Sequence, residues 1–467
     1  MRQLSRTRVS ALAALLAATA TTSCGGEGGS RPATEYQPPV PTVSVEEYAG
    51  RRDVVLETLS DGILLLQARP VEKGMEQWGF VQDPTFLYYS GLPETPGAIL
   101  ALDGFAREAH LFLPPPPSSF GMTVEGLTPV PGEQTANQLQ LDAARPWSEF
   151  MPWVEGRMVN GVTRLYLDES RNAESRGVPE GMAPVAGPRT LWSETVRTAF
   201  PTARIESAKN AIMRQRSVKS PAEIRILERN AHMTVEALLA ASVRLEPGVR
   251  QRQTEAAVVS ACLEAGAQGP SFWPWTMSGP NAHVPRLVGA FFRYDQGDRV
   301  AWDGEVVRVD IGCAGGLYGA DVGRTLPVSG EFSPGQAEAW NLLVKGYLAG
   351  LDAMADGVAI ADVRAASMAA VQDTRGLVTD EGRAAAEAIL DGGPGTWHIH
   401  GVGLDSGEDI PDPLRAGMVV AYEPGFSIGP DAYYLEDMIL VTTAGHRVLS
   451  SGLPYTASEI SEVMSGR

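Results

Sequence analysis

The sequence predicts an α+β protein in which a smaller α/β domain precedes the larger one. The chain has 467 residues, and single cores stop growing at roughly 250–300 residues, so two or three domains are expected. Helical and strand patterns alternate between residues 45 and 205. After residue 207 they are interspersed without regular βαβ spacing, which is typical of an α+β domain.

The first 24 residues have the pattern of an export signal. Three arginines precede an apolar run over residues 9–20, which is too short to span a membrane as a mature helix. The segment resembles a bacterial lipoprotein signal in which Cys24 becomes the acylated first residue. Simple secretion is the alternative, because Thr21 stands where such a signal has a large aliphatic residue. Residues 25–43 are rich in Gly and Pro, with one Ser, and predict a flexible tether.

We therefore expect an exported protein of the periplasm or cell envelope that touches a membrane only through its lipid anchor. The net charge of −18 argues against a nucleic-acid partner, because such proteins gather Lys and Arg on one face. Cys262 and Cys313 are the only other cysteines. A disulfide is open to them in an exported protein, but we interpret them as two small buried thiols.

The predicted α/β domain covers residues 44–206. Short apolar, β-prone runs indicate its strands, and longer mixed segments indicate its helices. In order, we expect a helix at 46–59, strands at 62–67, 86–90, 98–102, 110–113 and 165–168, and a helix at 191–200.

A capping box marks the first long helix of the second domain, residues 207–467. Ser220 is placed to cap it, Pro221 is its first residue, and Glu223 stands where the box requires an acid. Strands are expected at 299–313, 318–328, 399–404, 418–422 and 435–442, and helices near 334–354, 359–373 and 380–391.

Two aspartates lie on a predicted hairpin at residues 306–322. Its two apolar runs flank Gly315 and Gly316, a pair suited to a type I′ turn. A turn centred there would put Asp310 opposite Asp321, with Cβ atoms roughly 5 Å apart. Like charges this close need a cation or a shared proton. A solvated hairpin with two surface acids is the alternative, which the apolar character of both strands disfavours.

Two glutamates repeat this arrangement further along the chain. Glu423 follows one predicted strand and Glu436 begins the next, with a Gly-Pro pair midway. His400, beside a glycine turn, adds a nitrogen ligand. Four carboxylates and a histidine form the set that two Mn, Co, Zn or Fe ions sharing a bridging oxygen need.

At these motifs the chain resembles the pita-bread metallopeptidases, which include aminopeptidase P, prolidase, creatinase and methionine aminopeptidase. The similar segments are the aspartate strands at 309–312 and 320–328, the histidine motif at 400–405, and the glutamate motifs at 423–425 and 435–442. Residues 82–92 are similar to the N-terminal domain of aminopeptidase P and prolidase, which methionine aminopeptidases lack. The resemblance implies a C-terminal pita-bread domain behind that N-terminal domain.

The resemblance also implies an activity and residue roles. Asp310 would bind one metal ion, and Asp321 and Glu436 would bridge both. His400 and Glu423 would complete the second ion's shell, and Glu423 would also move a proton toward the leaving amine. The implied reaction removes the N-terminal residue of a peptide, with proline in second position, and uses two divalent ions, with Mn as first choice. Many relatives are dimers, so a homodimer is an option.

Three histidines that such relatives carry around the metals are missing. Their positions fall on Gly407, Thr396 and Arg286, and Tyr434 stands where an arginine is expected. Arg286 could hold an oxyanion or a substrate carboxylate by two parallel bonds, or it could lie on the surface.

His398 and His283 are candidates to compensate for the missing histidines. His398 lies two residues before His400, so on a strand both point to one face. A structural role is the alternative for each. The missing histidines support a second hypothesis, a divergent homologue that binds metal and peptide or hydrolyses another amide or amidine, without proline-directed hydrolysis.

Overall fold

The computed structural model describes residues 42–71, 80–116, 118–119, 122–123, 128–169, 188–283 and 298–466. Pro39–Arg467 form one compact unit. The predicted export signal with Cys24, most of the tether and Arg286 lie outside the described residues. No described helix combines the length and the apolar character that a membrane crossing needs.

A six-stranded mixed sheet, in the order β6-β3-β2-β1-β7-β8, organises the N-terminal region. Its strands are β1 (Gly62–Gln67), β2 (Ile99–Asp103), β3 (Glu108–Leu113), β6 (Ala143–Pro146), β7 (Arg164–Leu167) and β8 (Arg204–Ser207), and a separate pair is formed by β4 (Ser118–Ser119) and β5 (Met122–Thr123). The antiparallel pairs are β1–β2 and β2–β3, and the other three are parallel.

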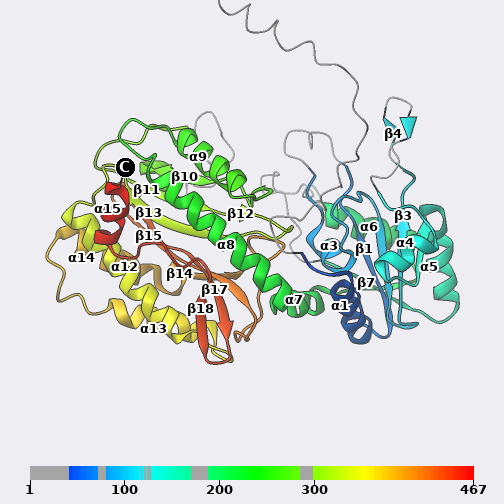
Figure 1. Cartoon of the computed structure of the whole chain (residues 1–467). Coiled ribbons are helices and arrows are strands. Elements are labelled where there is room, and N and C mark those ends of the chain that lie inside the picture. Colours follow the sequence, from blue (N-terminus) through cyan, green and yellow to red (C-terminus); the bar gives the residue numbers. More distant parts are fainter. Residues whose placement is uncertain are drawn as a thin grey trace, which may run out of the picture. The chain divides into compact units, whose positions relative to one another are not determined.

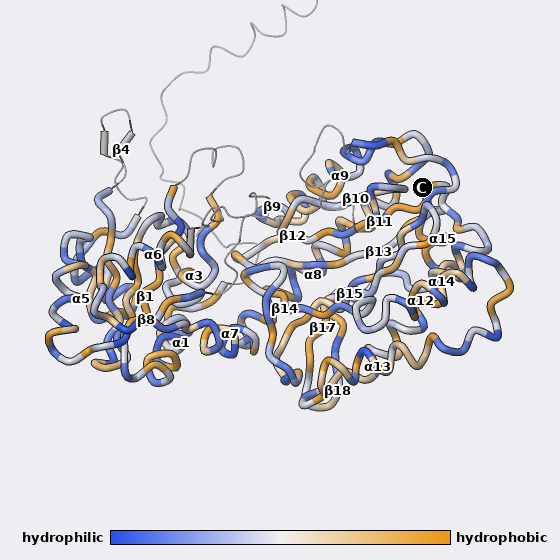
Figure 2. The backbone as a smooth tube through the Cα atoms, turned by 180° about the vertical axis from the view of Figure 1, so that it is seen from behind, coloured by the Kyte–Doolittle hydropathy of each residue, from blue (hydrophilic) through white to orange (hydrophobic). Residues whose placement is uncertain are grey.

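Helices cover both faces of this sheet, which explains the unbroken apolar sequence of β1. Leu64 and Leu66 pack into one core cluster, whereas Ile63 and Leu65 pack into another. The first cluster includes residues of α1 (Val45–Thr58), α3 (Pro84–Ser90), α4 (Glu133–Leu139) and α7 (Lys209–Ser217), and the second includes residues of α5 (Phe150–Val159) and α6 (Pro188–Ala199). Hydrophobic colours concentrate on strands such as β1 and β17 (Asp437–Thr442) in Figure 2.

The prediction of a strand at residues 86–90 is wrong, because this segment lies in α3. The Asp83 side chain caps the helix by accepting hydrogen bonds from the backbone N–H groups of Thr85 and Phe86, both over 2.9 Å. Pro84 is its first residue, and Gly91 ends it in the left-handed region at φ 70°. All residues from 85 to 90 are buried, so the segment lacks the polar face that marks most helices.

The second domain begins with the expected capped helix, α8 (Pro221–Ser242). The Ser220 hydroxyl accepts from the Glu223 N–H over 3.1 Å, and the Glu223 carboxylate accepts from the Ser220 N–H over 2.9 Å. The further helices are α9 (Gln251–Glu264), α12 (Pro334–Ala353), α13 (Ile360–Val371), α14 (Asp380–Gly392) and α15 (Ala457–Ser465), with 3-10 turns η1 (Trp147–Glu149) in the first domain and η2 (Gly279–Ala282) and η3 (Gly393–Thr396) here.

Two main sheets meet at the centre of this domain (Figure 1). One has the order β10-β11-β13, from β10 (Trp275–Ser278), β11 (Val306–Ile311) and β13 (Val322–Pro327). The other has the order β14-β15-β17-β18, from β14 (Trp397–Gly401), β15 (Val419–Ile428), β17 and β18 (Gly445–Val448), with β16 (Asp431–Tyr434) paired to β15. A short pair joins β9 (Gly269–Pro270) to β12 (Cys313–Ala314).

A bridge between Gly323 and Glu436 connects the two sheets, with backbone hydrogen bonds of 3.1 and 2.9 Å. One core cluster packs most of these strands against α8, α12 and α14, and a small second cluster joins β10, η2 and β16. The α+β class is confirmed. The predicted strands at 299–313 and 318–328 are too long, because regular pairing is limited to β11, β12 and β13.

The interpretation of Cys262 and Cys313 as two free thiols is wrong. They form a disulfide with 5.4 Å between the Cα atoms. Both cysteines are fully buried. The bond ties α9 to β12, three residues beyond Asp310, and closes a loop over a sequence separation of 51 residues.

Candidate metal centre and active site

The aspartate pair lies where β11 ends and just before β13 begins. The predicted register is wrong, because Asp310 pairs with Gly323 and not with Asp321. The partner is shifted by two residues, and side chains alternate with a period of two, so Asp310 and Asp321 still point to one face. They are diagonal neighbours, both buried.

The error in register comes from the turn. A bridge pairs Gly315 with Tyr318, so the central residues are Gly316 and Leu317, at φ 58° and 72°. Two positive φ values fit the type I′ turn that was expected, but its centre lies one residue later. The Asn230 side chain from α8 holds this turn by donating to the carbonyls of Gly315 and Tyr318, over 3.0 and 2.8 Å.

The glutamate pair is brought together as the sequence suggested. β15 returns into β16 through a turn at Gly429, whose φ is 52°. Tyr422 pairs with Asp437 and Gly425 pairs with Tyr434, and the same register places Glu423 opposite Glu436. Gly323 pairs with Asp310 on one side and forms a bridge with Glu436 on the other, so both glutamates lie beside the aspartates.

His400 completes the cluster. Its Nδ1 lies 3.0 Å from the Gly401 carbonyl oxygen, which places a proton on Nδ1 and makes Nε2 the candidate ligand atom. Nε2 lies 3.1 Å from Glu423 Oε1, 3.8 Å from Asp321 Oδ2 and 3.9 Å from Glu436 Oε1. The structure thus places four of the predicted ligands directly around one point, with Asp310 adjacent.

The electrostatics of the cluster favour a cation. Burial, followed by the charges of its acidic neighbours, raises the pKa of Asp321 and Glu436 well above their usual range. Burial also raises the pKa of Asp310, against the opposing charge of Arg308. The pKa of Glu423 is lowered, because hydrogen bonds with His398 and His400 outweigh the effect of burial. A bound cation would therefore favour ionisation of Asp310, Asp321 and Glu436, the three carboxyl groups whose pKa is raised.

The donor set fits divalent metal ions. Ligand atoms of Asp321, His400 and Glu436 lie within 4.8 Å of one another, as do those of His398, His400 and Glu423. Glu436 Oε1 is buried, and within the described part of the chain it has no hydrogen-bond partner. Such an oxygen is costly without a ligand, since a buried acceptor normally has a partner. Carboxylate oxygens and one imidazole suit Mn, Fe, Co or Zn.

The structure brings His398 to this cluster but not His283. His398 pairs with Glu423, and its Nδ1 contacts Glu423 Oε1 while its side chain is 57% exposed. His283 follows η2, and its Nε2 is buried without a hydrogen-bond partner in the segments that the structure describes. Ala282, the residue before His283, packs in one small cluster with Ala432 of β16.

Two residues that sequence reasoning did not assign also line the cluster. The Tyr434 hydroxyl lies 2.6 Å from Glu423 Oε2 and 2.7 Å from Glu436 Oε2. Arg308 Nη2 donates to Asp310 Oδ2 over 2.9 Å. Each residue stands two positions before a ligand on an extended segment, and this spacing puts both on the ligand face.

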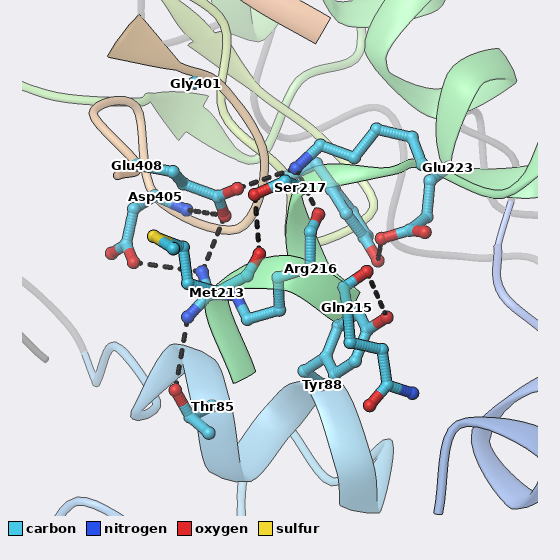
Figure 3. Close-up of polar contacts among 12 residues, drawn as sticks. Thr85, Tyr88, Met213, Gln215, Arg216, Ser217, Glu223, Gly401, Asp405 and Glu408 are labelled. Carbon is cyan, nitrogen blue, oxygen red and sulfur yellow. Dashed lines mark hydrogen bonds and ion pairs between the residues drawn. The ribbon is translucent and has the colours of Figure 1, made fainter. Parts of the chain in front are cut away.

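Buried charges hold the loop that follows His400. Glu408 accepts from Arg216 Nη2 and Lys219 Nζ, each over 2.6 Å, and Arg216 Nη2 also lies 3.1 Å from Asp405 Oδ2. Arg216 Nη1 donates to Thr85 Oγ1 on α3 over 3.2 Å. Figure 3 shows Arg216 between Thr85 and the loop with Asp405 and Glu408.

Gly407 and Thr396, which stand at two of the positions without the expected histidines, have structural roles in this protein. Gly407 belongs to the loop that Glu408 anchors. Thr396 ends η3, is buried, and its hydroxyl donates to the Ile389 carbonyl over 3.3 Å. Thr396 therefore caps the end of α14 and takes no part in the acidic cluster.

Comparisons with known proteins agree with this geometry. The chain matches the model of metallopeptidase family M24 over residues 225–443 and that of the aminopeptidase P N-terminal domain over residues 48–163. It is 26% identical to the Xaa-Pro aminopeptidase of Haemophilus influenzae, over 90% of this chain and 97% of that protein. It is 24% identical to the Xaa-Pro aminopeptidase of Escherichia coli, over 90% and 98%.

Solved structures show the same fold. Aminopeptidase PepP of Pseudomonas aeruginosa matches with a TM-score of 0.72, and aminopeptidase P from Escherichia coli with the inhibitor Pro-Leu matches with 0.71. Each is 22% identical and covers 91% of this chain and 99% of its own. Residues 225–443 thus match metallopeptidase family M24 and residues 48–163 match the aminopeptidase P N-terminal domain, which is the domain pair of an aminopeptidase-type metallohydrolase.

Proposed function

We propose that this protein is an exported aminopeptidase that uses two divalent metal ions to release the N-terminal residue of peptides with proline in second position. The observation that carries the proposal is the convergence of Asp310, Asp321, His400, Glu423 and Glu436, with Glu436 Oε1 buried and without a hydrogen-bond partner among the described residues. The names of the relatives, which are Xaa-Pro aminopeptidases, support the substrate class.

The chemistry that such a metal pair supplies is polarisation of the scissile carbonyl and activation of water near neutral pH. Asp310 would hold one ion, Asp321 and Glu436 would bridge both, and His400 and Glu423 would hold the other. Mn is the first choice, with Co, Zn or Fe as the alternatives. These five residues would also keep the reacting groups in a fixed orientation.

Glu423 would act as the proton carrier. One of its oxygens faces His398 and His400, and the other accepts from Tyr434. Its carboxylate is the group that would take a proton from the attacking water and pass it to the leaving amine. His398, with its exposed side chain, is our candidate for contacting the substrate.

A second candidate function is a metal- and peptide-binding homologue, or a hydrolase of another amide or amidine, without proline-directed hydrolysis. Gly407 and Thr396 favour it, because glycine has no side-chain donor for a developing oxyanion and the Thr396 hydroxyl donates to the Ile389 carbonyl. Roles for His283 and Arg286 in substrate binding remain proposals of the same kind.

A peptide panel separates the two functions. The chelator-treated protein is reloaded with Mn²⁺ and assayed on Xaa-Pro peptides and on matched peptides that carry alanine in place of proline. Release of the first residue from the proline series alone supports the first function. Equal rates on both series, or no release from either series, favour the second.

Export through lipidation of Cys24 is also proposed. The Cys262–Cys313 disulfide supports export, because such bonds persist in oxidising compartments. Mass spectrometry of the mature protein tests it: a diacylglyceryl or triacylated Cys24 is expected. An intact Met1, or an unmodified mature start elsewhere, would refute lipidation.

A further inference from the structure

We propose that Arg308 and Tyr434 form a positioning pair for the metal ligands. The pair fixes three of the four ligand carboxylates and thereby sets how tightly the centre holds its ions. Neither residue is among the five predicted ligands. This inference rests on the metal centre of the proposed function and deepens it, because it assigns the residues that hold the ligand side chains in place.

Arg308 orients Asp310. The two side chains lie on the same face of β11, two residues apart, and Nη2 reaches Asp310 Oδ2 over 2.9 Å. Only 11% of the Arg308 side chain is exposed, so this charge-assisted bond lies in a low-dielectric setting. With one carboxylate oxygen held, the direction of the other is fixed as well.

Tyr434 orients both glutamates. Its hydroxyl lies 2.6 Å from Glu423 Oε2 and 2.7 Å from Glu436 Oε2, so one phenol group spans the carboxylates of two neighbouring strands. Tyr434 is 2% exposed. Its ring needs a glycine at position 323, because a Cβ atom there would lie 2.2 Å from the ring. The backbone is thus shaped to admit this tyrosine.

A direct contact couples the two supports. The Arg308 guanidinium carbon lies 3.6 Å from the centroid of the Tyr434 ring, which is a close cation–π arrangement. The ring therefore holds the guanidinium toward Asp310, and the guanidinium holds the ring that carries the hydroxyl. Residues that merely filled the core would pack without aiming polar atoms at three ligands.

The test is a calorimetric titration of chelator-treated protein with Mn²⁺. Tyr434→Phe keeps the ring and removes one oxygen, and Arg308→Met keeps most of the length and removes the charge. Each is expected to weaken Mn²⁺ binding by about 10- to 100-fold. Arg308→Lys restores a cation and should recover part of the loss. The double variant should lose less than the product of the single losses, because the residues act together.

Two matched controls separate positioning from general destabilisation. Tyr433→Phe alters the adjacent buried tyrosine, whose ring stacks on Phe426 with 5.0 Å between centroids. Arg52→Met removes a buried arginine that donates to the carbonyls of Tyr89 and Leu139, each over 2.8 Å. Both should keep wild-type Mn²⁺ affinity even where thermal stability falls.

A second readout is the visible spectrum of the Co²⁺-loaded protein, which reports ligand geometry and should change in Tyr434→Phe but not in Tyr433→Phe. Folded Tyr434→Phe and Arg308→Met variants with wild-type Mn²⁺ affinity would overturn the inference. If Arg308→Met does not fold, the Tyr434→Phe result decides alone. A wild type that binds no divalent ion would instead overturn the proposed metal function, and this inference with it.

Discussion

Replacing Glu408 with glutamine removes a buried negative charge that two cations share. Arg216 and Lys219 each donate to its carboxylate over 2.6 Å, and all three side chains are buried. Glutamine keeps the size and one acceptor oxygen but leaves both cations without a counter-charge. Loss of one partner from a buried pair is costly because the remaining charge stays desolvated.

The pKa of Glu408 gives the magnitude. Burial alone would raise this pKa, but the charges of Lys219 and Arg216 outweigh it and lower the pKa to about 2 from an ordinary 4.5. At about 1.4 kcal/mol per pKa unit, this difference corresponds to about 3 kcal/mol of folding free energy. The folded-state pKa is the lower one, so the stabilisation is complete above about pH 4.5 and is lost as the pH falls toward 2.

Urea unfolding of wild type and Glu408→Gln between pH 7 and pH 3 measures this difference. We expect the variant to lose about 3 kcal/mol at pH 7, and the gap between the two proteins to narrow below about pH 4.5. Glu387→Gln on the exposed face of α14 is the control and should change stability by less than about 0.5 kcal/mol. A Glu408→Gln loss as small as the control's, or a gap independent of pH, would refute the reasoning.

Three other predictions concern the active centre and the disulfide. Glu423→Gln removes the base while keeping one ligand oxygen, so turnover should fall at least about 100-fold while metal analysis still finds part of the metal; a variant near wild-type activity would remove the proton role. His398→Ala should lower kcat far more than metal content if this imidazole does the work of the missing histidines. An unchanged kcat would make His398 structural. Reduction of the Cys262–Cys313 bond should lower the free energy of unfolding by about 2–4 kcal/mol, whereas a double alanine variant should not respond to reductant.

Local patterns were enough to predict most of the fold. The capping box at Ser220 and the apolar runs of β1 and β2 depend on neighbouring residues, and these elements are confirmed. The strand prediction for residues 86–90 failed because α3 is buried on all sides, so its sequence lacks the polar face that marks most helices. The cap residues Asp83 and Gly91 were the available signal.

Contacts between distant residues account for the other errors. The aspartate hairpin turns at Leu317, a residue that rarely takes positive φ, because Asn230 from α8 holds the carbonyls on either side. Pairing of Cys262 with Cys313 likewise depends on the approach of α9 to β12, which spacing alone does not reveal.

The candidate site also contains residues that the sequence predicts and residues that only the structure reveals. Carboxylate and histidine positions stand out in a sequence because each carries metal chemistry by its own residue type. The positioning roles of Arg308 and Tyr434 become visible only from their contacts with residues on other strands. Their spacing of two residues before Asp310 and Glu436 was the one signal that could have singled them out.

The most direct test of the central claim is the dependence of Xaa-Pro hydrolysis on the number of bound ions. Chelator-treated protein is titrated with Mn²⁺, and released amino acid and bound metal are measured in the same samples. We predict no hydrolysis without metal and a rate that rises to a plateau at two ions per chain. Hydrolysis that persists without metal, or two bound ions with no release of the first residue, would contradict it.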